Sequence, residues 1–195
     1  VPGAQPMSWD ARNQLQSVIN VQRSNGMNDG EWYRYSAAGE RVVKFSSRQA
    51  HAVVHQAVVH YLPGLEVRTA DEREELQVVH VQLARGSVRC LHWVNGPPDG
   101  IDNDQVRYSI DDHLGSSSLE LDQLAAVISH EGYYPYGGTA WWAARSKVDA
   151  DYKTIRYSGK EQDASGLYYY GARYYAQWLG RWINPDPAGN IDGLN

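Results

Sequence analysis

Histidines and aspartates are the residues of this sequence whose spacing first invites a chemical reading. His51 and His55 are four residues apart, and His60 follows on the same stretch. Residues at this spacing share one face of a helix or of a strand, as two metal ligands would. No Glu accompanies them as in an HExxH motif, and His60 is out of phase on a helix. We therefore interpret all three as structural or solvent-facing, and we predict neither a metal nor a cofactor.

Other catalytic and binding motifs are incomplete or missing from the sequence. The run DGIDND at 99–104 resembles part of a calcium loop but lacks the glycine at the sixth position and the closing glutamate, so we expect a solvated turn. No G-x-S-x-G, P-loop or G-x-G-x-x-G motif is present. Cys90 is the single cysteine, which excludes an intrachain disulfide and a cysteine zinc site. Hydrolase, kinase and dinucleotide-binding functions therefore lack support.

Two features near the C-terminus could carry chemistry, although spacing alone makes neither catalytic. Asp186, Pro187 and Gly189 fit positions i, i+1 and i+3 of a type I turn. Arg173 lies between a Gly-Ala pair and a Tyr-Tyr pair, where its guanidinium could stack on neighbouring tyrosines. From the residues alone, both features are explained by structure.

The elements that must position these residues are predicted to be β-strands. Short runs rich in Val, Tyr, Trp and Thr, several with alternating polarity, lie between turn signals such as Asn25-Gly26, Asp29-Gly30 and Gly137-Gly138. This pattern predicts an all-β, antiparallel chain with roughly 14–18 strands. Two stretches have some helical character: 47–61, and 119–129, which is typical of a short helix or a hairpin.

Composition and a repeated tetrad refine this prediction. The chain of 195 residues has 14 Tyr and 7 Trp but one Phe, and such side chains suit positions between a packed layer and water. The tetrad x-Arg-Tyr-Ser occurs at 33–36, 106–109 and 155–158, each time near a polar turn, and a related unit opens the chain at 8–15. We interpret these units as degenerate hairpin repeats that need neighbouring units to complete their packing. Generic hairpins of a β-sandwich are the alternative.

Bulk properties exclude some functions and leave others open. The net charge of −5 argues against a dedicated nucleic-acid binder, and no stretch approaches the ~20 apolar residues of a membrane span. The chain begins at Val1 and shows no secretory signal, so we expect a fragment or a processed product. The single cysteine fits synthesis in a reducing cytoplasm and does not exclude later export.

The C-terminal part of the sequence resembles a known family. IRYSGKEQDASGLYYYGARYY at 155–175 and WLGRWINPDPAG at 178–189 are similar to the RHS-repeat-associated core domain of RHS/YD-repeat proteins. The likeness is greatest to the C component of bacterial insecticidal ABC (Tc) toxin complexes. YLPGLE at 61–66, DDHLGSS at 111–117 and EGYYPYGG at 131–138 resemble the same subfamily, so the resemblance spans nearly the whole chain.

The resemblance implies both architecture and activity. In that family, antiparallel hairpins spiral into a hollow β-shell that encloses a toxic C-terminal segment, and the core domain closes one end. This implies shell strands over 1–130 and a core domain over 131–195. The implied partners are a large RHS-repeat B component, or further shell of the same protein, and the enclosed toxin segment. The implied location is the bacterial cytoplasm at synthesis and the extracellular space after secretion.

The same resemblance implies an aspartyl autoprotease that cuts the toxin free inside the shell. Asp186 matches the catalytic aspartate of the family's D-P-x-G motif, and Arg173 matches the conserved arginine of its A-R-Y-Y motif. An aspartyl protease needs two neighbouring carboxylates, of which one holds a proton while the other activates water. The family's second aspartate lies in a later motif that this chain does not reach. We do not assign that role to Asp192, and Asn190 replaces a common leucine.

Two other functions remain open at this point. The first is the shell of a polymorphic or contact-dependent effector of the same superfamily, which differs in its delivery. The second is a carbohydrate-binding β-module in which Trp141, Trp142 and the tyrosine clusters provide stacking platforms.

Overall fold

The structure is a computed structural model that describes residues 5–71 and 74–189. These residues form sixteen strands, one short helix α1 (Lys147–Asp151) and a 3₁₀ turn η1 (Tyr157–Gly159). The predicted all-β, antiparallel class is confirmed. The strands are β1 (Met7–Trp9), β2 (Leu15–Val21), β3 (Asp29–Tyr35), β4 (Arg41–Ala50), β5 (Val53–Leu62), β6 (Leu65–Ala70), β7 (Glu74–Leu83), β8 (Gly86–Trp93), β9 (Gln105–Asp111), β10 (Ser117–Leu121), β11 (Val127–Tyr133), β12 (Thr139–Ala144), β13 (Glu161–Gln162), β14 (Leu167–Tyr169), β15 (Tyr174–Ala176) and β16 (Arg181–Trp182).

Strands β1 to β12 form one antiparallel sheet in which each strand pairs with its neighbours in the sequence. Helical character over 47–61 is wrong, because β4 and β5 form a hairpin there that is paired from Val43↔His60 to Ala50↔Val53. The β-branched valines of this stretch favour a pleated strand over a helix. The alternative of a hairpin over 119–129 is confirmed by the pairing of β10 with β11.

One turn geometry recurs seven times in the described chain. The N–H of its first residue bonds to the carbonyl of the fifth, and the N–H of the fourth bonds back to the carbonyl of the first. The fourth residue has a φ between 59° and 89°. In six of the seven turns this is the left-handed residue that follows a type I turn, whereas in 156–160 the third residue, Ser158, also has a positive φ, of 52°. Glycine adopts this φ without steric cost, which explains why it is frequent there. These fourth residues are Asn13, Gly39, Gly115, Ala125, Gly137, Gly159 and Gly166.

The repeated x-Arg-Tyr-Ser tetrads do not occupy equivalent places. The tetrad at 33–36 ends on the first residue of a turn, the one at 106–109 lies inside β9, and the one at 155–158 forms part of a turn. The recurring structural unit is therefore the hairpin turn and not the tetrad. Asp29-Gly30 is also not a turn, because both residues belong to β3 and both are buried.

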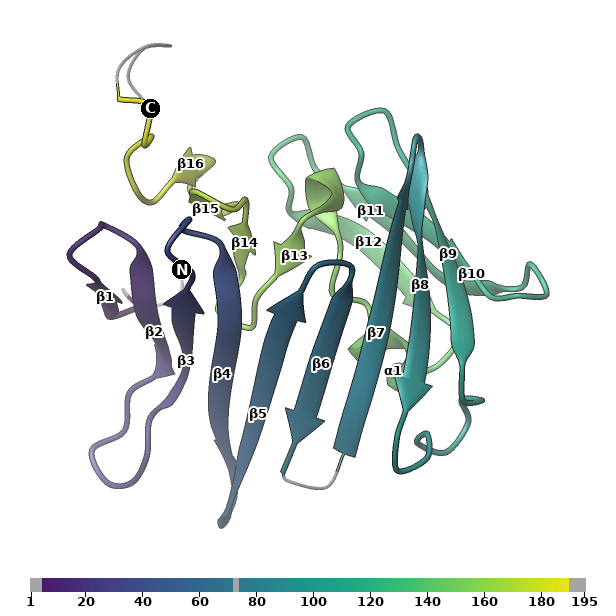
Figure 1. Ribbon diagram of the computed structural model, residues 1–195, viewed down its shortest axis with the longest axis horizontal. Helices are drawn as coiled ribbons and strands as arrows, with labels where there is room; N and C mark the ends of the chain where they lie inside the picture. Colours follow the sequence, from purple (N-terminus) through teal and green to yellow (C-terminus); the bar gives the residue numbers. More distant parts are fainter. Residues whose placement is uncertain (1–4, 72–73, 190–195) are drawn as a thin grey trace.

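After β12 the chain reverses through α1 and runs back along one face of the large sheet, where β13 to β16 form a second, four-stranded sheet (Figure 1). Leu167 and Tyr174 of this small sheet pack against Leu15 and Tyr33 of the large one. Around α1, Tyr152 meets Trp93 edge-on at 5.3 Å between ring centroids. Residue 131 lies within β11, and β12 continues the large sheet beyond it, so the division at this residue stays a prediction.

The interface between the small sheet and the large one contains buried ion pairs as well as apolar side chains. Arg41 of β4 contacts Glu161 at 2.5 Å and Asp163 at 2.7 Å, and Lys44 contacts the same two carboxylates at 2.5 and 2.8 Å. Burial opposes ionisation of Glu161, but Lys44 and Arg41 outweigh it, so its pKa lies below the usual value. A second cluster joins Glu131 to Arg156 at 2.6 Å.

Three tyrosines are buried in this polar interior. Tyr33, Tyr168 and Tyr174 are at most 2% exposed, so they do not lie at a water boundary as the composition led us to expect. Their hydroxyls have protein partners instead: Tyr174 and Tyr35 share a hydrogen bond of 2.8 Å between their oxygens, and Tyr168 donates to the carbonyl of Gly137. Phenylalanine in these places would leave buried polar groups without partners.

In the described part of the chain, no helix has both the length and the apolar character needed to cross a membrane.

Candidate functional site

Asp186 begins a turn that shares one hydrogen bond with the recurring turns. The N–H of Gly189 bonds to the carbonyl of Asp186 at 2.9 Å, and Gly189 has a φ of 73°. The predicted turn at Asp186 is therefore confirmed. The Oδ1 atom of Asp186 also accepts the N–H of Ala188 at 2.9 Å. In the same way Asp112 accepts the N–H of Leu114, two residues later, at 2.8 Å.

Asp186 differs from Asp112 in its second carboxylate oxygen. The Oδ2 atom of Asp186 lies 2.9 Å from Nη1 of Arg173, with the two side chains 38% and 23% exposed. The structure thus brings together the two residues that the sequence singled out. The pair is partly open to solvent, so its contribution to stability is about 0–1 kcal/mol. Its geometry, with a cation fixed against a carboxylate, is suited to positioning a charge.

Arg173 also stacks on an aromatic ring. Its guanidinium carbon lies 4.1 Å from the ring centroid of Trp182 in β16. Tyr170 packs edge-on against the same tryptophan at 4.8 Å between centroids. Arg173 thus stacks on an aromatic ring, as expected, and this partner is a tryptophan that the β15–β16 pairing places beside Tyr175.

Asn184 is a residue of this site that sequence reasoning missed. Its Oδ1 atom accepts the N–H of Tyr174 at 3.0 Å, and its Nδ2 atom donates to the carbonyl of Ala172 at 3.1 Å. Asn184 therefore holds both neighbours of Arg173 and lies two residues before Asp186. Its side chain is buried, at 6% exposure. The only signal in the sequence was its place in the NPDPAG run, which does not reveal a contact with residues ten positions away.

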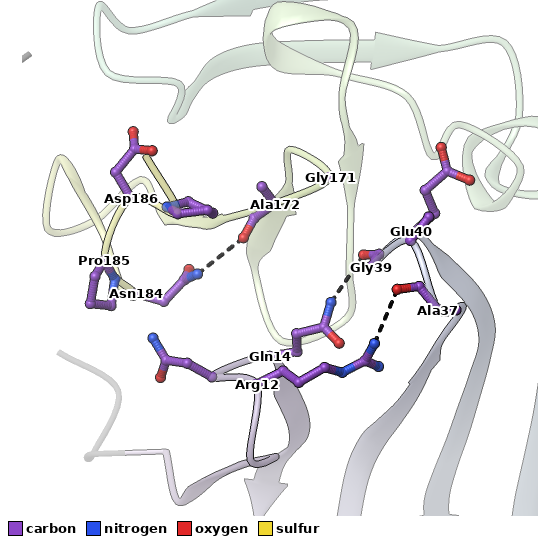
Figure 2. Close-up of a pocket in the computed structure, with 13 residues that line it drawn as sticks. Arg12, Gln14, Ala37, Gly39, Glu40, Gly171, Ala172, Asn184, Pro185 and Asp186 are labelled. Carbon is purple, nitrogen blue, oxygen red and sulfur yellow. Dashed lines mark hydrogen bonds between the residues drawn. The ribbon is translucent and has the colours of Figure 1, made fainter. Parts of the chain in front are cut away.

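A cleft of about 510 Å³ opens beside this pair. One wall comes from the turns that follow β1 and β3, with Arg12, Gln14 and the residues 37–40, and the other from 171–172 and 184–187 (Figure 2). Glu40 is the second carboxylate that lines the cleft, across from Asp186. Asp192, which we did not assign, lies outside the described residues.

His51, His55 and His60 do not form a cluster in the structure, and His55 contacts an aspartate instead. His51 lies in the turn between β4 and β5, while Nδ1 of His55 lies 2.7 Å from Oδ2 of Asp71. His60 is on β5. Within 5–71 and 74–189, no three His, Cys, Asp or Glu side chains gather in a way that could hold a metal ion.

Trp141 and Trp142 do not form one platform. They are neighbours on β12, and successive side chains of a strand point to opposite faces. Trp141 packs on His130 at 4.5 Å between centroids, whereas the guanidinium of Arg156 lies 4.3 Å above the ring of Trp142. A sugar would meet one of these rings but not both on the same surface.

Comparisons with known proteins give relatives in bacterial toxins. No family model matches the chain. Two proteins of Yersinia entomophaga, "Toxin subunit YenC2" and "Toxin subunit YenC1", are 52% and 48% identical to it over 196 and 200 residues. These alignments cover 98% and 100% of this chain and 20% of each relative. The chain therefore spans about a fifth of the length of these relatives and is homologous to that part of them.

Solved structures give the same result. A crystal structure of TcdB2–TccC3 superimposes with a TM-score of 0.95 at 54% identity, covering 99% of this chain and 10% of the other. A structure of the Photorhabdus luminescens Tc holotoxin pore superimposes with a TM-score of 0.93 at 53% identity, covering 99% of this chain and 9% of the other. Sequence identity and backbone superposition with these structures thus both extend over nearly the whole chain.

Proposed function

We propose that this chain is a segment of the toxin-encapsulating RHS shell of an ABC (Tc) toxin C component. The observation that carries the proposal is the match of almost the whole chain, at about half identity, to one fifth of two toxin subunits. The fold supports it, because within the described residues β1 and β12 each have a strand neighbour on one side only. Such edges call for further strands.

The shell proposal includes partners and location. The wall is completed by a large RHS-repeat B component or by further shell of the same protein, and it encloses a C-terminal toxin segment. The small sheet β13–β16 lies on the inner face and belongs to the core domain that closes the shell. The protein is made in the bacterial cytoplasm and acts outside the cell as part of the toxin complex.

We further propose that Asp186 is one carboxylate of an aspartyl autoprotease that cuts the toxin segment free. The contact between Arg173 and Oδ2 supports the role of the charged member, which accepts a proton from the attacking water while a protonated partner acid polarises the scissile carbonyl. The partner acid comes from a later part of the subunit. Asn184 and Trp182 hold Arg173 in place for this step.

The test of this role is Asp186→Asn in the full-length subunit, with Asp112→Asn as the matched control. Asparagine keeps an oxygen that accepts the turn N–H and removes only the charge, so the fold is preserved. We expect the Asp186 variant to remain one uncut chain on a denaturing gel, and the Asp112 variant to be cut at the normal rate. Normal cutting of Asp186→Asn would remove Asp186 from the mechanism.

The rival functions are favoured by no specific observation. A contact-dependent effector would use the same shell with another delivery route. A carbohydrate-binding module needs aromatic rings on one surface, and Trp141 and Trp142 lie on opposite faces of β12.

A further inference from the structure

We propose that the cleft between the turns 10–14 and 36–40 on one side and the 171–172 and 184–187 segments on the other binds an extended peptide, the stretch of chain that carries the scissile bond. This inference rests on the proposed autoprotease and identifies its substrate-binding site. It assigns a role to residues that lie some 150 positions before Asp186 in the sequence. The residues that form the two walls are Arg12, Asn13, Gln14, Ala37, Ala38, Gly39, Glu40, Gly171, Ala172, Asn184, Pro185, Asp186 and Pro187.

Small side chains let a main chain approach both walls closely. Ala37 and Ala38 on one side and Gly171 and Ala172 on the other are exposed. A Cβ atom built on Gly171 would meet nothing within 4 Å, so the space beside this residue is open. A large aromatic ligand would find no ring to stack on among the lining residues, whereas an extended peptide needs only a narrow channel and main-chain partners.

Main-chain donors are available along both walls. The N–H groups of Ala37, Ala38, Gly171 and Ala172 take part in none of the hydrogen bonds formed within the described part of the chain. The carbonyls of Ala37 and Ala172, by contrast, already accept bonds from Arg12 and Asn184. The walls therefore offer donors, which match the carbonyl oxygens of an extended peptide.

Gln14 adds an acceptor at the base of one wall. Its amide nitrogen, Nε2, donates to the carbonyl of Gly39 at 3.1 Å, which fixes the orientation of the amide (Figure 2). Its Oε1 atom is shielded from solvent and has no hydrogen-bond partner among the described residues. A buried acceptor without a partner is costly, so the wall beside Gln14 keeps a polar group that the described residues leave unsatisfied.

The position of Asp186 links the cleft to the reaction. Asp186 and Pro187 form part of the rim, and the described chain ends two residues further on, at Gly189. A segment that follows in the same chain is tethered beside the cleft, which gives it a high effective concentration there. A peptide seated between the walls would pass the carboxylate of Asp186 where it leaves the cleft.

The first test fills the cleft. Ala38→Trp places a large ring at the third position of the turn 36–40, and Leu124→Trp places the same ring at the third position of the equivalent turn 122–126, where Leu124 is 84% exposed and lines no part of the cleft. In the full-length subunit we expect Ala38→Trp to slow cutting by about tenfold or more, and Leu124→Trp to change the rate less than about twofold, at equal melting temperatures. Equal cutting rates for both variants would overturn the cleft proposal.

The second test does not depend on cutting. A photo-cross-linking residue, p-benzoylphenylalanine, replaces Ala38 or Leu124 in the full-length Asp186→Asn subunit, and mass spectrometry identifies the peptides that it captures. We expect residue 38, but not residue 124, to capture the segment that carries the scissile bond. Absence of that segment from the cross-links of residue 38 overturns the cleft proposal. Normal cutting of Asp186→Asn defeats the autoprotease assignment instead, and the cross-links still decide whether the cleft binds the peptide.

Discussion

At the scale of single residues, the site is built on a turn that begins at Asp186. Asp186 makes the same main-chain contact as Asp112 in an ordinary turn, and its second oxygen adds a bond to Arg173. The turn thus places the carboxylate of Asp186 beside the cleft. Asn184 and Trp182, both within four residues of Asp186, hold the arginine from the other side.

Arg173→Lys is expected to impair cutting without unfolding the protein. Lysine keeps the charge but loses the planar fork and much of the stacking on Trp182, so the carboxylate of Asp186 is held less firmly. We expect the rate of cutting to fall by about tenfold or more, with a change in stability below about 1 kcal/mol. Time courses on denaturing gels together with thermal melts measure both quantities. A lysine variant that cuts as fast as the wild type would show that the fork geometry is dispensable.

The sequence located part of this site and not the rest. Asp186 and Arg173 were found because the resemblance rests on short motifs that contain them, and the turn followed from local chemistry. Asn184, Trp182 and Gln14 were missed, since their roles depend on the pairing of β15 with β16 and on the approach of the first turns to the C-terminal segment. Local patterns do not encode contacts between residues 150 positions apart.

At the scale of elements, the small sheet is joined to β4 through buried charges as much as through apolar contacts. Arg41 is 4% exposed and contacts both Glu161 and Asp163. Its guanidinium also lies 4.2 Å from the ring centroid of Tyr169 in β14. Such an arrangement specifies one docking geometry, because any displacement would leave charges buried without partners.

Arg41→Met is expected to destabilise this docking strongly. Methionine matches much of the arginine's volume but leaves Lys44 as the remaining cation in contact with Glu161 and Asp163, so we expect a loss of about 3–5 kcal/mol. Arg34→Met is the control, because Arg34 is exposed on the neighbouring strand β3, and it should change stability by less than about 0.5 kcal/mol. Urea denaturation compares the two variants. Similar midpoints would mean that the buried pairs do not hold the sheet.

Acid is expected to loosen the same element. The pKa of Glu161 is lowered in the folded state, so its ionised form stabilises the fold above the ordinary pKa of a glutamate, and this stabilisation is lost as the pH falls towards the folded value. Glu66 of β6 behaves in the same way. Its pKa is lowered to about 2 because the charge of Arg68 outweighs the opposing effect of burial. The urea concentration at the midpoint of unfolding should therefore decrease when the pH is lowered from 5 to 3.

Glu161→Gln is the control for this pH dependence. The variant should be less stable at pH 7, since Arg41 and Lys44 lose a charged partner, and its midpoint should change less with acid. An unchanged acid dependence in Glu161→Gln would assign the effect to other carboxylates.

At the scale of the molecule, the sheet has an apolar face that the C-terminal segment does not cover. Val81, Val88 and Tyr108 lie side by side across β7, β8 and β9, and Val81 and Tyr108 are 51% and 43% exposed. Together with the open edges at β1 and β12, this face makes the described part of the chain unlike a self-sufficient globule.

We expect residues 1–195 produced alone to associate or to be poorly soluble. Unpaired strand edges and exposed apolar side chains favour contacts between copies. Light scattering coupled to size-exclusion chromatography measures the mass of the species in solution. A sharp monomer with cooperative unfolding would contradict the view that the chain is a strip of a larger wall.

The fold class was predictable because each hairpin carries its own signals in turn residues and alternating strands. The strands at 41–45, 66–69 and 76–83 were anticipated and each is part of an observed strand, and the predicted strand at 88–94 matches β8 except for Val94, which lies in the following turn. The path of the C-terminal segment along one face was not anticipated. This path depends on ion pairs such as Arg41–Glu161, which join residues 120 positions apart and cannot be predicted from a local sequence pattern.

Native size-exclusion chromatography of the full-length subunit with its shell partner, followed by a denaturing gel of the eluted peak, tests the central claim most directly. If the chain is a wall segment of a closed shell with Asp186 at the cutting site, the cut C-terminal fragment will elute with the shell and separate only on the denaturing gel. The Asp186→Asn subunit will give a single uncut band in the same peak. A fragment that elutes apart from the shell under native conditions would contradict enclosure, and a cut Asp186→Asn chain would contradict the site.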